Sequence, residues 1–213
     1  MRNHWVPQLL AGLVIAAAAV VWFSLAQSLP PSVDRTLHRE LGEALAREAL
    51  ARLGKEAEIT VITRDTTDFP QPALDHLLAG FTRTARKANA RIAAVRALEV
   101  DPLRLVEVPS GDFISLLRRA KPGDVIVSLM GPPLLTPDDQ RQLGPVHARV
   151  VAFCPGALPA QIDLRRLFAD GLIHAAVVSQ RARADGATKP LPLTFEQSYR
   201  VVTATNVGAL YLN

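Results

Sequence analysis

Polar side chains follow directly after an apolar segment near residue 60. Residues 58–63 read EITVIT, which predicts a strand, and residues 64–69 read RDTTDF. In an open α/β sheet, ligands bind beyond the carboxyl ends of the strands. The two hydroxyls, two carboxylates and one guanidinium of this loop can therefore hold a small polar molecule. The alternative, which the sequence leaves open, is that its Asp and Thr residues only shape the turn and cap the next helix.

Further loops are predicted at the same edge of the sheet. Residues 131–135 follow the third predicted strand, residues 154–157 the fourth and residues 180–183 the fifth. The first loop is the most polar of the four, and the others can contribute single groups. The candidate ligand-binding residues are Arg64, Asp65, Thr66, Thr67, Asp68, Phe69, Gly131, Gln180 and Arg181.

Motifs for catalysis, nucleotides and metals are absent from the sequence. It contains no G-x-G-x-x-G after a strand, no phosphate-binding P-loop and no G-x-S-x-G, and its five His lack metal-ligand spacing. Cys154, the single cysteine, ends a predicted strand and is a possible nucleophile. No His or Asp is visibly arranged to activate it, and the alternative is an inert buried thiol. We therefore expect no catalytic residue, no metal and no cofactor, and an enzyme that uses Cys154 stays a minor alternative.

The charge balance argues against a nucleic-acid partner. The chain has 24 Lys and Arg against 20 Asp and Glu, a net charge of +4, and the two signs are interspersed. The densest basic group, Arg83, Arg86, Lys87 and Arg91, is read as the solvated face of one helix. Aromatic residues make up only 5%, which leaves few platforms for base stacking.

The N-terminal segment is expected to be a membrane anchor. Residues 9–26 are 18 uncharged residues, and a helix of this length spans roughly 27 Å, enough for a hydrocarbon core. The alternative is a cleaved signal peptide, since Arg2 precedes the segment and Ser24-Leu25-Ala26 resembles a cleavage site. Arg2 and the N-terminal amine favour residues 1–8 in the cytoplasm, and Arg35 and Arg39 past the other end leave the opposite topology open. With residues 1–8 in the cytoplasm, the chain is expected to be a single-pass protein of the inner membrane. Its body then lies on the periplasmic or extracytoplasmic side, and the lipid bilayer is a partner.

After the anchor we expect a linker and a juxtamembrane helix within residues 27–56, and one domain over residues 57–213. The helix is predicted over residues 33–53, with Ser32 as its cap and Gly54 after its end. Its leucine stripe packs either on the domain itself or on a partner chain.

Apolar runs alternate with amphipathic segments through the rest of the chain. The predicted helices cover residues 73–92 and 162–169, with two more beginning at Ser110 and Thr136. This alternation predicts a three-layer α/β domain with a doubly wound, mainly parallel sheet of about five or six strands, of Rossmann-like or flavodoxin-like type. The predicted strands are 58–63, 103–108, 124–130, 148–153, 172–179 and 199–204.

Five segments resemble type 1 periplasmic binding proteins, the sugar-binding proteins of ABC importers and their LacI-like relatives. The stretch DFISLLRRAKPGDVIVSLMGPP is similar to that family's helix followed by a D-x-I-I-x-S-P strand, and FADGLIHAAVVSQ resembles a late strand of the family. The family has two lobes that clamp the ligand, and most of one lobe has no counterpart here, so the resemblance implies a single truncated lobe. The segments cover residues 77–92, 112–133, 147–156, 168–180 and 193–207.

The resemblance implies two functions in addition to the minor enzymatic alternative. The first is a membrane-anchored, non-enzymatic interaction or accessory subunit that associates with another membrane protein or complex. The second is a receptor or sensor for a small polar, sugar-like ligand, in which Phe69 is the candidate for the aromatic residue that stacks on a sugar.

Overall fold

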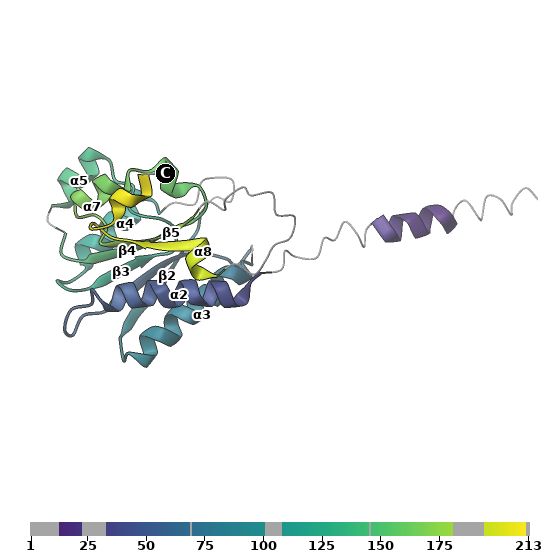
Figure 1. Cartoon of the computed structure of the whole chain (residues 1–213), viewed down its shortest axis with the longest axis horizontal. Coiled ribbons are helices and arrows are strands. Elements are labelled where there is room, and N and C mark those ends of the chain that lie inside the picture. The colour runs from purple at the N-terminus through teal and green to yellow at the C-terminus, as the bar shows by residue number, and fades with distance from the viewer. Residues whose placement is uncertain are drawn as a thin grey trace, which may run out of the picture. The chain divides into compact units, whose positions relative to one another are not determined.

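The chain divides into two compact units, residues 1–33 and 34–213. The computed structural model describes residues 13–22, 33–68, 70–100, 108–144, 146–180 and 194–211. Residues 13–22 are helical and exposed (purple in Figure 1). They form the middle of the predicted 9–26 anchor, whose two ends lie outside the described residues. Among the described residues, no helix has both the length and the apolar character needed to span a membrane.

In the described part of the second unit, six strands form one sheet in the order β2-β1-β3-β4-β5-β6 (Figure 1). The first five strands in this order pair in parallel, and β6 pairs antiparallel with β5. This confirms the predicted mainly parallel α/β sheet. The strands are β1 Ile59–Arg64, β2 Ile92–Leu98, β3 Val125–Ser128, β4 Arg149–Cys154, β5 Ala175–Ser179 and β6 Tyr199–Val202.

Helices cover both faces of the sheet and give the three layers expected (Figure 1). On one face, α2 and α3 bury Leu45 and Phe81 against the strands; on the other, α4 and α7 bury Phe113 and Leu164. The helices are α2 Arg35–Leu50, α3 Pro72–Lys87, α4 Ser110–Arg119, α5 Pro137–Leu143, α6 Leu158–Gln161, α7 Leu164–Ala169, α8 Phe195–Ser198 and the 3-10 helix η1 Val207–Tyr211.

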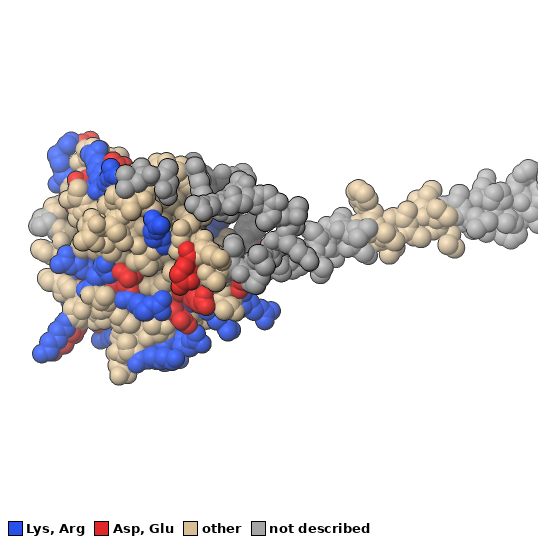
Figure 2. Space-filling view, viewed as in Figure 1, with Lys and Arg blue, Asp and Glu red and all other residues tan. Residues whose placement is uncertain are grey.

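Charged side chains are mixed over the visible face of the domain. Figure 2 shows Lys and Arg interspersed with Asp and Glu, without one large patch of a single sign among the described residues on that face. Ion pairs join several of them, including Arg83 with Glu43, which connects α3 to α2, and Arg91 with Glu58 at 2.8 Å.

The second strand is where the sequence-based assignment was wrong. The predicted helix 73–92 ends at Lys87, Asn89 takes a left-handed conformation with φ 55°, and β2 begins at Ile92. The helical spacing continued through Ala88 to Ile92, so the start of β2 was assigned to the helix. β2 lies at the edge of the sheet and is half-exposed, and its sequence IAAVRAL is rich in alanine, which is depleted in strands. The predicted strand 103–108 lies outside the described residues, except for Val108, which is not in a strand.

The helix ends follow the expected capping chemistry at α5 and differ from it at α2 and α4. Ser110, predicted to cap α4, is its first residue, and the N-cap is Pro109, which has no side chain that can cap. Thr136 caps α5 in a capping box with Asp139, as predicted. The helix predicted over residues 33–53 is α2, and its cap is Asp34, whose carboxylate accepts from the backbone N–H groups of Thr36 and Leu37, both at 3.0 Å. The predicted cap Ser32 lies outside the described residues. Of the two packing alternatives for this helix, the structure has it on its own domain.

The crossing of α2 over α3 leaves no room for side chains at two glycines. A Cβ added to Gly42 would overlap the carbonyl oxygen of Leu77 and lie 2.8 Å from the backbone nitrogen of Phe81. A Cβ added to Gly80 would overlap the carbonyl oxygen of Arg39. The two backbones therefore touch, and both helices reach the sheet only because these two positions lack a side chain.

Cys154 ends β4 inside the core on the α4–α7 face of the sheet. Its side chain has 0% exposure, and burial raises the pKa of the thiol to about 12. The thiolate is the reactive form of cysteine, so this environment suppresses reactivity. The inert-thiol alternative is the one that the structure favours.

The glycine crossing predicts a loss of stability on adding a single methyl group. Gly42→Ala and Gly80→Ala should each lower the free energy of unfolding by about 1–3 kcal/mol or more, because backbone atoms cannot move aside as a side chain can. Alanine is the better helix former by about 1 kcal/mol, so helix propensity alone predicts the opposite sign. Urea unfolding followed by circular dichroism measures the difference.

Gly111→Ala is the matched control. Gly111 lies in the first turn of α4, and no described residue comes within 4 Å of its added Cβ. This variant should be neutral or slightly stabilising. Equal stabilities for all three variants would contradict the close crossing.

The buried thiol predicts slow chemical labelling. At pH 8, the native protein should react with a maleimide or disulfide reagent at least about a thousandfold more slowly than the urea-unfolded chain, because of the raised pKa and the burial. Stopped-flow or mass-spectrometric labelling in both states measures the ratio. Labelling of the native chain at the unfolded rate would show that Cys154 is accessible.

Candidate functional site

The strand order reverses between β1 and β3. The chain passes from β1 through α3 to β2 on one side, and then returns across β1 through α4 to β3 on the other. Crossovers that leave neighbouring strands in opposite directions open a crevice above the strand ends, which is where ligands bind in such sheets. The carboxyl edge, where the parallel strands end at Arg64, Ser128, Cys154 and Ser179, therefore has its candidate site above β1 and β3.

The loop after β1 is ordered by Asp65. The backbone N–H of this residue donates to the carbonyl of Leu98 at 2.8 Å, which ties the ends of β1 and β2 together. Its Oδ1 accepts from the hydroxyl of Thr67 at 2.6 Å and from the backbone N–H of Thr67 at 2.9 Å. These bonds, the side-chain one first, lower the pKa of Asp65, so the carboxylate is ionised at neutral pH.

This geometry decides part of the turn-or-ligand question. Asp65 does shape the turn, as the alternative states, but the loop does not cap the next helix. The N-cap of α3 is Gln71, which makes no capping bond with its side chain in the part of the chain that the structure describes. Thr67 and Asp68 are exposed, and Arg64 and Thr66 are half-exposed, so these polar groups remain at the rim.

A hydroxyl at the end of β1 was missed by sequence reasoning. Thr63 is 4% exposed, and its Oγ1 has no hydrogen-bond partner among the described residues. A buried polar atom without a partner costs free energy, and this one lies beneath the rim, closed off from the surface. A single Thr in an apolar strand gives no signal of its own in the sequence, which is why it was not among the candidates.

The other side of the crevice is a tight backbone turn after β3. Gly131 has φ 94°, a left-handed conformation that glycine adopts readily, and a Cβ there would lie 3.0 Å from the side chain of Leu158 in α6. Ser128 is fully buried, and its Oγ accepts from the backbone N–H of Met130 at 3.3 Å. This side therefore offers a packed wall rather than free polar side chains.

The remaining candidates do not join this group. The side-chain amide of Gln180 donates to the carbonyls of Glu196 at 2.6 Å and Tyr199 at 2.9 Å, so it fastens α8 and β6 to β5. Gln180 also lies two strands beyond β3, roughly 10 Å along the sheet. Phe69 and Arg181 lie outside the described residues. The structure thus places Arg64, Asp65, Thr66, Thr67 and Asp68 at or after the end of β1 and Gly131 after the neighbouring strand β3, at the same edge of the sheet, and places Gln180 two strands away.

Two hollows in the described surface lie away from the carboxyl edge. One, of about 330 Å³, includes Arg149 and His174 at the starts of β4 and β5, on the opposite edge of the sheet. A second, between α4 and α5, includes Ser110, Arg118 and Asp139. The carboxyl edge is thus an open rim of polar groups that can contact one side of a ligand.

No protein-family model matches the sequence, and no curated protein shows significant similarity to it. Solved structures do resemble this fold. A carbohydrate-transporter solute-binding protein from Agrobacterium radiobacter, in complex with D-arabinose, matches 84% of this chain with a TM-score of 0.55 and 17% identity. An arabinose-binding protein from Geobacillus stearothermophilus matches 82% of the chain with a TM-score of 0.53 and 17% identity.

A putative LacI transcriptional regulator from Bacteroides fragilis matches 81% of this chain with a TM-score of 0.54 and 12% identity. The matches cover 63%, 63% and 61% of the three solved chains, so this chain spans less than two thirds of their length. At these identities the likeness concerns the fold. The predicted resemblance is confirmed at that level: the chain folds like a single truncated lobe of periplasmic sugar-binding proteins and LacI-like regulators.

Proposed function

We propose that this chain is a non-enzymatic binding lobe that receives a small polar ligand, sugar-like in its hydroxyl chemistry, at the carboxyl edge above β1 and β3. The observation that carries the proposal is the reversal of strand order between β1 and β3, which gathers the polar loop after β1 at one crevice. The fold that the chain shares with sugar-binding proteins supports the same conclusion.

The groups at this edge suit a ligand with hydroxyl groups. The ionised carboxylate of Asp65 accepts hydrogen bonds, and the guanidinium of Arg64, which has no ion pair among the described residues, donates them. The hydroxyls of Thr66 and Thr67 at the rim can do either. Charged groups that face neutral hydroxyls make strong hydrogen bonds, which lets a few contacts orient a small molecule.

A second candidate is a membrane-anchored accessory subunit, and one observation favours it. The chain spans about 60% of its structural neighbours, and a single lobe contacts only one side of a ligand. Good small-molecule sites bury 70–90% of the ligand surface, so a second surface from a partner would complete the site. The apolar side chains of the helical residues 13–22 are exposed, as those of a membrane anchor would be.

The ligand proposal predicts thermal stabilisation by sugars. In a screen of pentoses and hexoses that includes D-arabinose, a ligand at ten times its Kd should add about 1.4 kcal/mol, or raise the Tm by about 3–5 °C. Arg64→Ala should weaken this binding at least about tenfold. Arg86→Ala, on the exposed side of α3, is the matched control and should leave it unchanged. Failure of every sugar at 50 mM, or the same shift in Arg64→Ala, would refute the site.

The anchor proposal predicts where the C-terminal residue lies. A reporter enzyme that is active only outside the cytoplasm, fused after Asn213, should be active in cells, and the full chain should resist extraction by high salt but not by detergent. Deletion of residues 1–32 should abolish reporter activity, since nothing would then direct export. If a second reporter, one that works only inside the cytoplasm, is active when fused after Asn213, the proposed placement is wrong. If high salt extracts the full chain from the membrane, the anchor is wrong.

A further inference from the structure

A hollow at the amino edge, the edge where the parallel strands begin, contains charged groups that the proposed function does not use. It has a volume of about 330 Å³ and lies between the end of α5, the start of β4, the end of α7 and the start of β5. Its polar side chains are Gln140, Arg149, Asp170 and His174. The carboxyl edge lies at the other ends of the same strands, so this is a separate place on the domain.

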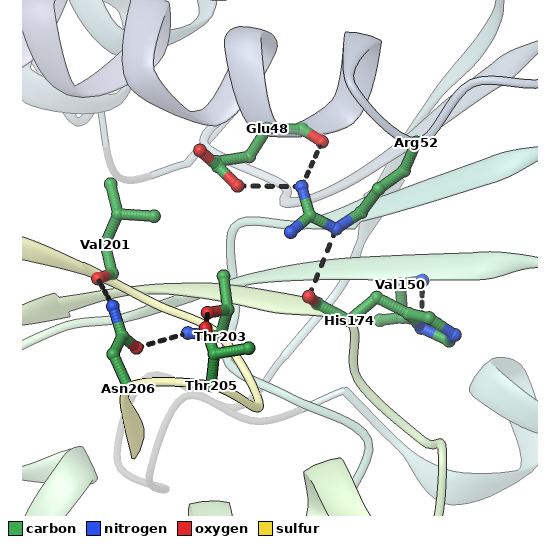
Figure 3. Close-up of polar contacts among 8 residues, drawn as sticks. All are labelled: Glu48, Arg52, Val150, His174, Val201, Thr203, Thr205 and Asn206. Carbon is green, nitrogen blue, oxygen red and sulfur yellow. Dashed lines mark hydrogen bonds and ion pairs between the residues drawn. The ribbon is translucent and has the colours of Figure 1, made fainter. Parts of the chain in front are cut away.

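The imidazole of His174 is held in one orientation. The backbone N–H of Val150 donates to its Nδ1 at 3.2 Å (Figure 3), so in the neutral ring the hydrogen belongs on Nε2. The backbone of His174 is fixed as well, because its carbonyl accepts from Nε of Arg52 at 3.1 Å, and Arg52 is itself bound by Glu48 at 2.7 Å. The ring therefore cannot turn without breaking its hydrogen bond from the backbone N–H of Val150.

Arg149 faces this ring with an excess of donors. Its Nη1 lies 2.9 Å from Nε2 of His174, so two hydrogen-bond donors meet when Nε2 carries the hydrogen. The other neutral tautomer only moves the conflict to the N–H of Val150. Among the described residues, no carboxylate lies within 4 Å of the Arg149 guanidinium. The contact between Arg149 and His174 therefore brings two donors together, and an acceptor beside both groups would satisfy them.

The charge state of His174 sharpens the conflict. Burial first, and then the charges of Arg149 and Arg52, lower the pKa of His174 from 6.5 to about 4, so the ring is neutral at pH 7. The charged groups around it are Arg149 from β4, Arg52 and Glu48 from the end of α2, and Asp170 after α7. The net effect on the ring disfavours the imidazolium and leaves an N–H that can donate to an oxygen.

We propose that this hollow binds a small carboxylic acid whose carboxylate accepts hydrogen bonds from Arg149 and from Nε2 of His174. Asp170 lines the same hollow, and its carboxylate is 3.5 Å from Nε of Arg166. The carboxylate of Asp170 repels a ligand that carries more than one negative charge, and it can accept a hydrogen bond from a donor group of the ligand. The acid that fits best therefore carries one carboxylate together with a hydroxyl or ammonium group, as lactate and glycine do.

Proton linkage makes the site testable without a known ligand. A bound carboxylate stabilises the imidazolium, so binding must raise the pKa of His174 from about 4 towards its ordinary value. By the same linkage, binding must strengthen as the pH falls from about 6.5 towards 4, provided that the ligand stays ionised. A structural role for the Arg149–His174 contact alone would produce neither effect.

The experiment is an NMR titration of the histidine ring signals of the full chain in detergent micelles, at constant ionic strength. Lactate, glycine, acetate and inorganic phosphate are added in turn at up to 20 mM. We expect a saturable shift of the His174 signals with lactate or glycine, a proton affinity raised at least about tenfold, and weaker effects with acetate and phosphate. Arg149→Gln should abolish the response, and Arg96→Gln, an exposed arginine on β2, should leave it unchanged.

The Asp170→Asn variant separates the binding of the carboxylate by Arg149 and His174 from the preference for a hydroxyl or ammonium group. It should reduce the preference for lactate or glycine over acetate and leave the binding of acetate in place. Tighter binding of phosphate than of every carboxylate would overturn the class of ligand. No saturable shift with any of the four additions, or an unchanged response in Arg149→Gln, would overturn the site. Since the sugar screen concerns the other edge of the sheet, its result does not affect this outcome.

Discussion

The fold depends on the contact between α2 and α3. The crossovers through α4, α5 and α7 serve β3, β4 and β5 from one face. Among the described residues, the opposite face receives α3 from a crossover and Phe195 of the short helix α8. α2, which comes before the first strand, contacts β3, β4 and β5 on that face. Without it, Val127, Val151 and Val177 would face water. Gly42 and Gly80 let the backbones of α2 and α3 touch, so both helices can pack on the same face of the sheet and cover these valines.

The same helix connects the two edges of the sheet. α2 ends close to the start of β1, so it runs antiparallel to the strands, and its last turn reaches the amino edge. There Arg52 bonds to the carbonyl of His174, and the hydrogen-bonded turn of Thr203 and Asn206 follows β6 (Figure 3). Displacement of α2 would expose one face of the sheet and also release the backbone of His174. The segment before the first strand is therefore part of the domain.

The sequence predicted the elements whose signals are local. The apolar runs of β3 and β4 marked buried strands, and the Thr136–Asp139 pair marked the start of α5. β2 was missed because the helical spacing of α3 continued to Ile92 and because the alanines of β2 favour a strand only weakly. The glycine crossing was missed for another reason: Gly42 and Gly80 are 38 positions apart, and only the tertiary structure shows that they meet. Thr63 and the fastening role of Gln180 also depend on neighbours that come from other elements.

The open carboxyl edge limits what one lobe can achieve. A ligand held by Arg64 and Asp65 would keep its far side in water. Water would therefore compete strongly for each hydrogen bond that the ligand makes with these two residues. A few such bonds, each worth about 0.5–1.5 kcal/mol, must first offset the loss of translational and rotational freedom on binding. We therefore expect millimolar affinity at best for the lobe alone. A second surface over the same crevice would exclude water, strengthen each existing bond and add contacts, so the affinity of this site depends on what faces the edge rather than on the edge alone.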